Sequence, residues 1–137
     1  MTSLWHPDYT LIVGQKRVLV IEDDRSIARL TEVILNSKGI KTHLCLDASH
    51  AVEMAKRVDP DVIILDIHMP RQSGIGVLKQ LRQDDLTMQT PVIISSVLSR
   101  RESIDQLREM GADDFVSKSA GIDALITKTM DYLTSSQ

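Results

Sequence analysis

The stretch VIILD, residues 62–66, decides the fold class, because a run of branched apolar residues ends there at a carboxylate. A run without apolar–polar alternation is typical of a strand buried on both faces of a parallel sheet. The stretch PVIIS at 91–95 has the same character. Three further β-rich runs are expected to form strands, at residues 17–22, 40–46 and 113–118.

Helical patterns lie between and after these runs. Ile27, Leu30 and Ile34 recur at helical spacing and should share a buried face, with Gly39 ending the helix. The other helices are expected at 49–57, at 74–82, from a capping-box pattern at Ser99 to Gly111, and from Ile122 to Leu133. Five strand–helix units in series predict an α/β fold, a doubly wound five-stranded parallel sheet with helices on both faces.

Composition excludes several classes of function. The chain has 137 residues and a net charge of −3, which is too mild to indicate direct nucleic-acid binding. Its single cysteine, Cys45, rules out an intramolecular disulfide and a cysteine-rich metal site, and a reducing cytoplasm fits this. No apolar run approaches the roughly 20 residues that cross a bilayer, and no signal peptide is evident.

Residues 1–15 are expected to form a leader and residues 16–137 the folded domain. The leader carries Leu4, Trp5 and Tyr9 and is too apolar for a disordered tail. Two interpretations stay open. The leader packs along the edge of the domain, or it contacts a partner or a second copy in a homodimer.

Acidic residues follow two of the expected strands. Glu22, Asp23 and Asp24 follow the first strand, and Asp66 ends the third. Ligands of such sheets bind at the carboxyl ends of the strands. If these two strands are neighbours, the carboxylates converge and repel one another unless a cation enters, and an oxygen-only site suits Mg²⁺. The alternative is that residues 22–24 simply cap the following helix.

Two other strand ends carry polar groups. Ser95 and Ser96 end the fourth strand, and Lys118 ends the fifth. A carboxylate nucleophile, a hydroxyl, an ammonium and a metal together make a site for phosphoryl transfer. Taken singly, Lys118 is more often a lysine that reaches from a strand end to solvent, and Ser96 a turn serine. Only their combination on successive strands is specific.

Four segments, VLVIEDD, VIILDIHMPRQSG, PVIISS and GADDFVSK, resemble the receiver domain of bacterial two-component response regulators, a flavodoxin-like fold. The resemblance implies that Asp66 is the phosphorylated residue. It also implies that Asp23 and Asp66 bind Mg²⁺ directly, while Glu22 acts through water and His68 through its backbone carbonyl. Ser96, Lys118 and Phe115 would then be the hydroxyl, the lysine and the aromatic switch.

The resemblance further implies partners. A histidine kinase or a histidine phosphotransfer protein would donate the phosphoryl group. The output would be a contact with another protein through the face formed by the fourth helix, fifth strand and fifth helix. The chain is expected to be a stand-alone cytoplasmic receiver, with a piece of a longer regulator or hybrid kinase as the alternative.

Some residues depart from the family pattern. Val97 stands where a small residue is usual, and Leu98 is apolar, so we expect slow self-dephosphorylation; a phospho-form that lasts only seconds would contradict this. Ser119 replaces the usual proline after Lys118, which favours a trans peptide. Ser73 stands where aspartate is common before Gly74.

Two other functions compete with the phosphorylatable switch. One is an adaptor that keeps the fold and works without phosphorylation. The other is a small phosphatase-type hydrolase with Asp66 as nucleophile. The hydrolase would need a second carboxylate at position 68, where His68 stands instead.

Overall fold

A computed structural model describes residues 15–69, 73–97 and 101–135 of the chain. The described part contains one sheet of five parallel strands in the order β2-β1-β3-β4-β5. The strands are β1 Arg17–Ile21, β2 Lys41–Cys45, β3 Val62–Leu65, β4 Val92–Ser96 and β5 Asp114–Ser117. The α-helices are α1 Arg25–Ser37, α2 Ala51–Val58, α3 Gly74–Gln83, α4 Arg101–Glu109 and α5 Ile122–Ser135.

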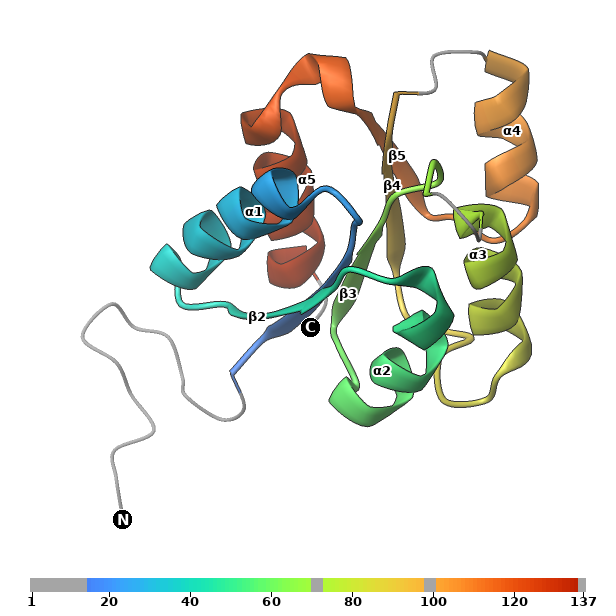
Figure 1. The fold of residues 1–137 in the computed structure, drawn as a ribbon, viewed down its shortest axis with the longest axis horizontal. Coiled ribbons are helices and arrows are strands. Elements are labelled where there is room, and N and C mark those ends of the chain that lie inside the picture. Colours follow the sequence, from blue (N-terminus) through green and yellow to red (C-terminus); the bar gives the residue numbers. More distant parts are fainter. Residues whose placement is uncertain (1–14, 70–72, 98–100, 136–137) are drawn as a thin grey trace.

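The helices cover both faces of the sheet, so the predicted doubly wound fold is confirmed (Figure 1). Side chains of β1 alternate between two cores. Leu19 and Ile21 pack with α2, α3 and α4 on one face, and Val18 and Val20 pack with α1 and α5 on the other. The strand VIIL of β3 is buried throughout, which explains its continuous apolar sequence.

Local sequence sets the helix ends. The carboxylate of Asp24 accepts hydrogen bonds from the N–H groups of Ser26 and Ile27 and caps α1. Gly39, with φ of +84°, lets the chain leave α1 and enter β2. Asp59 adopts a left-handed conformation directly before Pro60 and ends α2.

The structure corrects some expectations. Leu30 does not share the buried face of α1, since it is 47% exposed; Ala28, Thr31 and Leu35 are the fully buried residues. Four strands are shorter than predicted by one residue at one or both ends, whereas β4 begins and ends one residue later than the predicted 91–95. The leader at 1–14 and the predicted cap at Ser99 lie outside the described residues. Within the described part, no helix has the length and apolar character needed to span a membrane.

Candidate functional site

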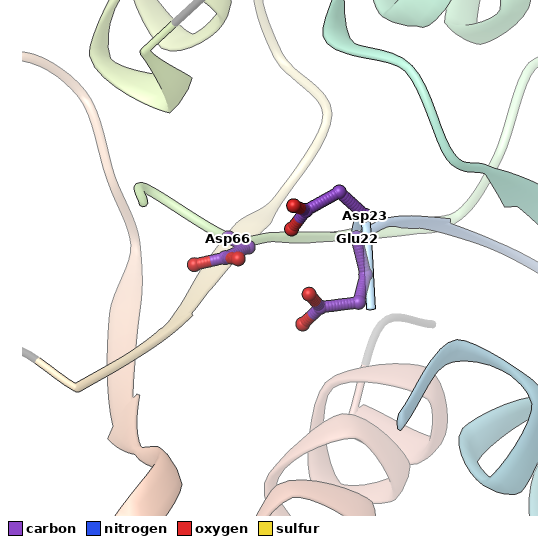
Figure 2. Close-up of side chains that lie close together, drawn as sticks. All are labelled: Glu22, Asp23 and Asp66. Atoms are coloured by element: carbon purple, nitrogen blue, oxygen red, sulfur yellow. The ribbon is translucent and has the colours of Figure 1, made fainter. Parts of the chain in front are cut away.

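The site forms where β1 and β3 lie side by side, which is the condition on which the expected convergence of the carboxylates depended. Ile21 is the register partner of Leu65, and the N–H of Asp66 donates to the carbonyl of Ile21 at 3.0 Å. Each strand therefore ends at the same edge of the sheet, and the next residues along the chain meet there. Figure 2 shows the carboxylates of Glu22, Asp23 and Asp66 directed toward one another.

One carboxylate oxygen from each of these three residues lies within 4.8 Å of the others. Glu22 and Asp66 are buried, and Asp23 is half-buried. Asp24 points elsewhere, because its carboxylate caps α1. The helix-cap interpretation of the acidic run is thus correct for Asp24 alone, and the other two acids converge on Asp66.

Lys118 joins the cluster from the end of β5. Its Nζ lies 2.7 Å from Oε1 of Glu22 and 3.2 Å from Oδ2 of Asp66. The lysine side chain is 20% exposed, whereas both acids are almost fully shielded from solvent. One ammonium therefore faces two buried carboxylates, with Asp23 adding a third acidic group to the same edge.

The charges of the cluster are not balanced. The pKa of Glu22 is raised to about 7, mainly by burial and also by the negative charge of Asp66, although the hydrogen bond from Lys118 lowers it. For Lys118, burial is the strongest single influence and lowers the pKa, but the hydrogen bonds and charges of Glu22 and Asp66 together outweigh burial, and its pKa is raised. The three acids therefore share one ammonium, and burial is the main reason that Glu22 is hard to ionise.

The donor set fits a divalent cation. Three carboxylates supply hard oxygen ligands, and Asp23 keeps one side of the cluster open to solvent. Mg²⁺ favours one or two carboxylates together with several waters. Among the described residues, Glu22, Asp23 and Asp66 form the group of acidic side chains whose oxygen atoms lie close enough together to hold one metal ion.

The loop after Asp66 is held against the cluster. The N–H of His68 donates to Oδ1 of Asp66 at 3.0 Å, while the imidazole side is exposed to solvent. Lys118 and His68 thus bond different oxygens of the same carboxylate and fix its orientation. The role expected of the His68 carbonyl toward a metal stays a prediction.

Gly74 is a positioning residue that the sequence analysis treated only as a helix start. A methyl group at its Cα would overlap the backbone carbonyl oxygen of Asp66 and lie 2.7 Å from Cα of Ile67. The N–H of Gly74 donates to the carbonyl of Ile67 at 3.0 Å. Ser73 accepts from the N–H of Ile75 and caps α3, which gives this departure from the family pattern a structural use. A glycine directly after a cap serine was the available sign of this close approach.

Ser96 and Phe115 lie on the same side of the sheet. Ile94 and Phe115 are register partners and contact the core formed with α2, α3 and α4. Ser96 follows Ile94 by two residues and so faces this side; it is fully buried, while Phe115 is half-buried. Their predicted roles as hydroxyl and switch stay predictions.

The remaining departures have different outcomes. The Lys118–Ser119 peptide is trans, as expected, and Lys118–Ala120 form a short 3-10 turn. Val97 is 66% exposed, and Leu98 lies outside the described residues. Slow dephosphorylation therefore stays a prediction.

Comparisons with known proteins agree with this geometry. The response regulator receiver domain matches residues 18–130. The transcriptional regulatory protein DltR of Streptococcus agalactiae is 33% identical over 112 residues, which cover 82% of this chain and 49% of DltR. The polar-differentiation response regulator DivK of Brucella anthropi is 27% identical, covering 86% of this chain and 96% of DivK. The chain spans about half the length of the first curated relatives it matches.

Solved structures give the same result. The receiver domain of the Francisella response regulator 1452 superposes with a TM-score of 0.82 at 32% identity, covering 90% of this chain and all of that domain. The chemotaxis protein CheY4 of Vibrio cholerae shares the fold, with a TM-score of 0.81 at 23% identity. Because the matched region includes all five strands and the acidic cluster, the chain belongs to the family of response regulator receiver domains.

Proposed function

We propose that this chain is a phosphorylatable switch in which Asp66 accepts a phosphoryl group from a phosphohistidine of a histidine kinase or phosphotransfer protein. The observation that carries the proposal is the convergence of Glu22, Asp23 and Lys118 on the Asp66 carboxylate. An aspartate without a function at the end of a strand would not require two further carboxylates and an ammonium beside it.

The chemistry follows from these groups. A carboxylate oxygen of Asp66 attacks phosphorus, a P–O bond forms, and the P–N bond to the donor imidazole breaks; the imidazole leaves with the electron pair and takes a proton from solvent. Glu22, Asp23 and Asp66 would hold the Mg²⁺, which supplies positive charge to the phosphoryl oxygens. Lys118 stands 3.2 Å from Asp66 and can neutralise the same oxygens.

The negative charge of the phosphoryl group would change the conformation of the face formed by α4, β5 and α5. The phosphoryl group adds about −1.5 to −2 charges and strong acceptor oxygens beside Lys118. Ser96 would move toward these oxygens, and Phe115 on the same side of the sheet would turn inward into the space released. The altered face would then bind an output protein. The switch works only to the extent that the phosphoryl group stabilises one state over the other.

Mass spectrometry of the intact protein tests the proposal. The chain is incubated with Mg²⁺ and acetyl phosphate or phosphoramidate, small donors that need no kinase. We expect a single phosphoryl adduct, which is lost in Asp66→Asn and when a chelator removes Mg²⁺. Asp131→Asn makes the same acid-to-amide change on the exposed surface of α5 and should leave the adduct in place.

The competing functions give different results in this assay. An adaptor that works without phosphorylation would form no adduct in the folded, Mg²⁺-loaded protein. A hydrolase would consume the donor continuously without a stable adduct. Either result would contradict the proposal.

A further inference from the structure

A pocket lies beside β2, the edge strand on the opposite side of the sheet from β5, and contains none of the residues of the Asp66 site. The pocket, of about 550 Å³, opens between the first residues of β1, the edge strand β2 and the end of α2. It is lined by the basic side chains of Arg17, Lys41, His43 and Arg57, with Met54 and Val58 as apolar neighbours from α2. The volume lies within the usual range of ligand pockets.

The basic side chains stand where core residues would be expected. Leu19, Ile21 and Cys45 pack into the core under α2. Arg17 and His43 precede these residues by two positions on β1 and β2 and therefore face the same side of the sheet. Helix α2 buries Ala51 and Ala55 in this core, whereas Met54, Arg57 and Val58 near its end line the pocket. Arg17 and Lys41, the first residues of β1 and β2, are register partners beside that end of the helix.

The positive charge of this pocket is not compensated. No acidic residue is among the described side chains that line it, although the chain as a whole has a net charge of −3. Burial lowers the pKa of His43, and the charges of Lys41 and Arg17 lower it further. Asp61, which follows α2, is turned to the backbone N–H of Arg17 at 2.8 Å. The guanidinium of Arg17 is itself fixed, since it donates to the carbonyl of Val58 at 3.0 Å.

The pocket adjoins the outer edge of the sheet. Within the part of the chain that the structure describes, strand β2 pairs with β1 alone. The N–H of Lys41 donates to Lys16, and the carbonyl of Cys45 accepts from Glu22, so the odd-numbered residues of β2 turn their backbone groups toward β1. The backbone groups of Thr42 and Leu44 then face outward, where an extended chain can add as a further strand.

We propose that the outer edge of β2 and the basic pocket beside it bind an extended acidic segment of a partner protein. The charged side chains of Arg17, Lys41 and Arg57 would pair with carboxylates, and the outward backbone groups of Thr42 and Leu44 would pair with the backbone of the segment. A small anion would contact only the basic side chains, whereas an extended acidic peptide would also form backbone hydrogen bonds with the outer edge of β2. The inference is independent of phosphorylation, because the pocket shares no residue with the Asp66 site.

Fluorescence anisotropy tests this with the full chain and a labelled peptide of alternating glutamate and valine. We expect saturable binding at low salt that weakens as salt rises, and no binding of a matched lysine–valine peptide. Lys41→Glu and Arg57→Glu should each weaken binding by about tenfold or more. Lys79→Glu makes the same charge change on an exposed position of α3 and should alter binding by less than about twofold.

Amide hydrogen exchange and NMR shifts locate the contact. The peptide should protect the amides of Thr42 and Leu44 and shift the His43 ring, in wild type and in Asp66→Asn alike. Equal binding by Lys41→Glu, with its fold verified by circular dichroism, would overturn the proposal, as would no binding at low salt. Inorganic triphosphate that shifts His43 more strongly than the peptide would instead identify a small-anion site. Tighter binding of an oligonucleotide than of the peptide would identify a nucleic acid as the occupant. NMR shifts of β2 that depend on protein concentration alone would identify a second copy of this chain.

Discussion

Lys118 is bound more closely to Glu22 than to the aspartate that it would assist, with 2.7 Å between Nζ and the glutamate Oε1. The lysine therefore serves as the internal counter-ion of the acidic cluster. A metal ion bound by these acids would compensate the same carboxylates as Lys118, so each cation would weaken the need for the other.

The first prediction concerns pH. The pKa of Glu22 is raised from 4.5 to about 7 in the fold, so between these values the folded chain holds a proton that the unfolded chain has lost. In chelator-containing buffer, this group's contribution to the free energy of unfolding should fall as pH rises from about 4.5 to about 7, by roughly 1–3 kcal/mol, and level off above. Urea unfolding at pH 5 and pH 8 measures it.

Glu22→Gln should remove this component and be more stable than wild type at pH 8 without metal. Glu53→Gln is the matched control, since that side chain is 78% exposed and should leave the pH slope unchanged. An identical slope in Glu22→Gln would show that the glutamate is not the titrating group.

The second prediction separates metal binding from phosphorylation. Lys118→Met removes the hydrogen bond and charge that lower the pKa of Glu22, so this pKa should rise above about 7. Above that pH, calorimetry should show tighter Mg²⁺ binding, by several-fold, because a competing cation is gone. Phosphorylation by acetyl phosphate should nevertheless slow. Lys128→Met, which breaks an ion pair with Asp114 at 3.3 Å, should change neither quantity.

The third prediction assigns the metal to the correct acids. Asp23→Asn should weaken Mg²⁺ binding by about tenfold or more, since it removes one carboxylate of three. The neighbouring Asp24→Asn should leave binding and stability nearly unchanged, because asparagine also caps a helix. Equal losses in calorimetric titrations of the two variants would contradict the assignment.

The fourth prediction compares two glycines of α3. Gly74→Ala places a methyl group against the backbone of Asp66 and Ile67. We expect a loss of about 1–3 kcal/mol in stability and slower phosphorylation, because the Asp66 loop must shift. Gly76→Ala meets no atom within 4 Å and should be neutral or stabilising by about 0.5–1 kcal/mol. Denaturant unfolding and the adduct assay measure both effects.

The fifth prediction concerns Arg82, which joins the α3–β4 and α4–β5 loops at the opposite end of the sheet. Its guanidinium donates to the carbonyls of Gly111, Thr87 and Thr90 at 2.8–3.1 Å and pairs with Asp113 at 3.0 Å. Arg82→Lys keeps the charge but loses the planar fork, and should cost about 2–4 kcal/mol of unfolding free energy.

Arg29→Lys is the control for Arg82→Lys. Its side chain is 72% exposed and bonds Glu32 one turn along α1, so the substitution should change stability by less than about 0.5 kcal/mol. A loss in Arg82→Lys no larger than this would mean that the loops do not depend on the guanidinium.

The sequence predicted most of the site because parallel sheets gather strand ends at one edge. The apolar runs located β1 and β3, and the acids directly after them had to lie near the ligand-binding edge. Leu30 shows the limit of such reasoning: its helical spacing suits a buried face, but α1 turns Ala28, Thr31 and Leu35 inward and leaves Leu30 exposed.

By itself, the sequence determined the order of strands and helices along the chain, the family, and the acids and lysine that meet at Asp66, because these depend on periodicity and on position along the chain. The tertiary structure alone decided that Lys118 pairs with Glu22, that Asp24 caps α1, that Gly74 touches the Asp66 backbone, and that Arg17 and His43 share a pocket. Some of these contacts join residues that are distant in sequence, such as Glu22 and Lys118. Others give different roles to sequence neighbours, such as Asp23 and Asp24. Their distances depend on how the helices pack on the sheet, which no local pattern encodes.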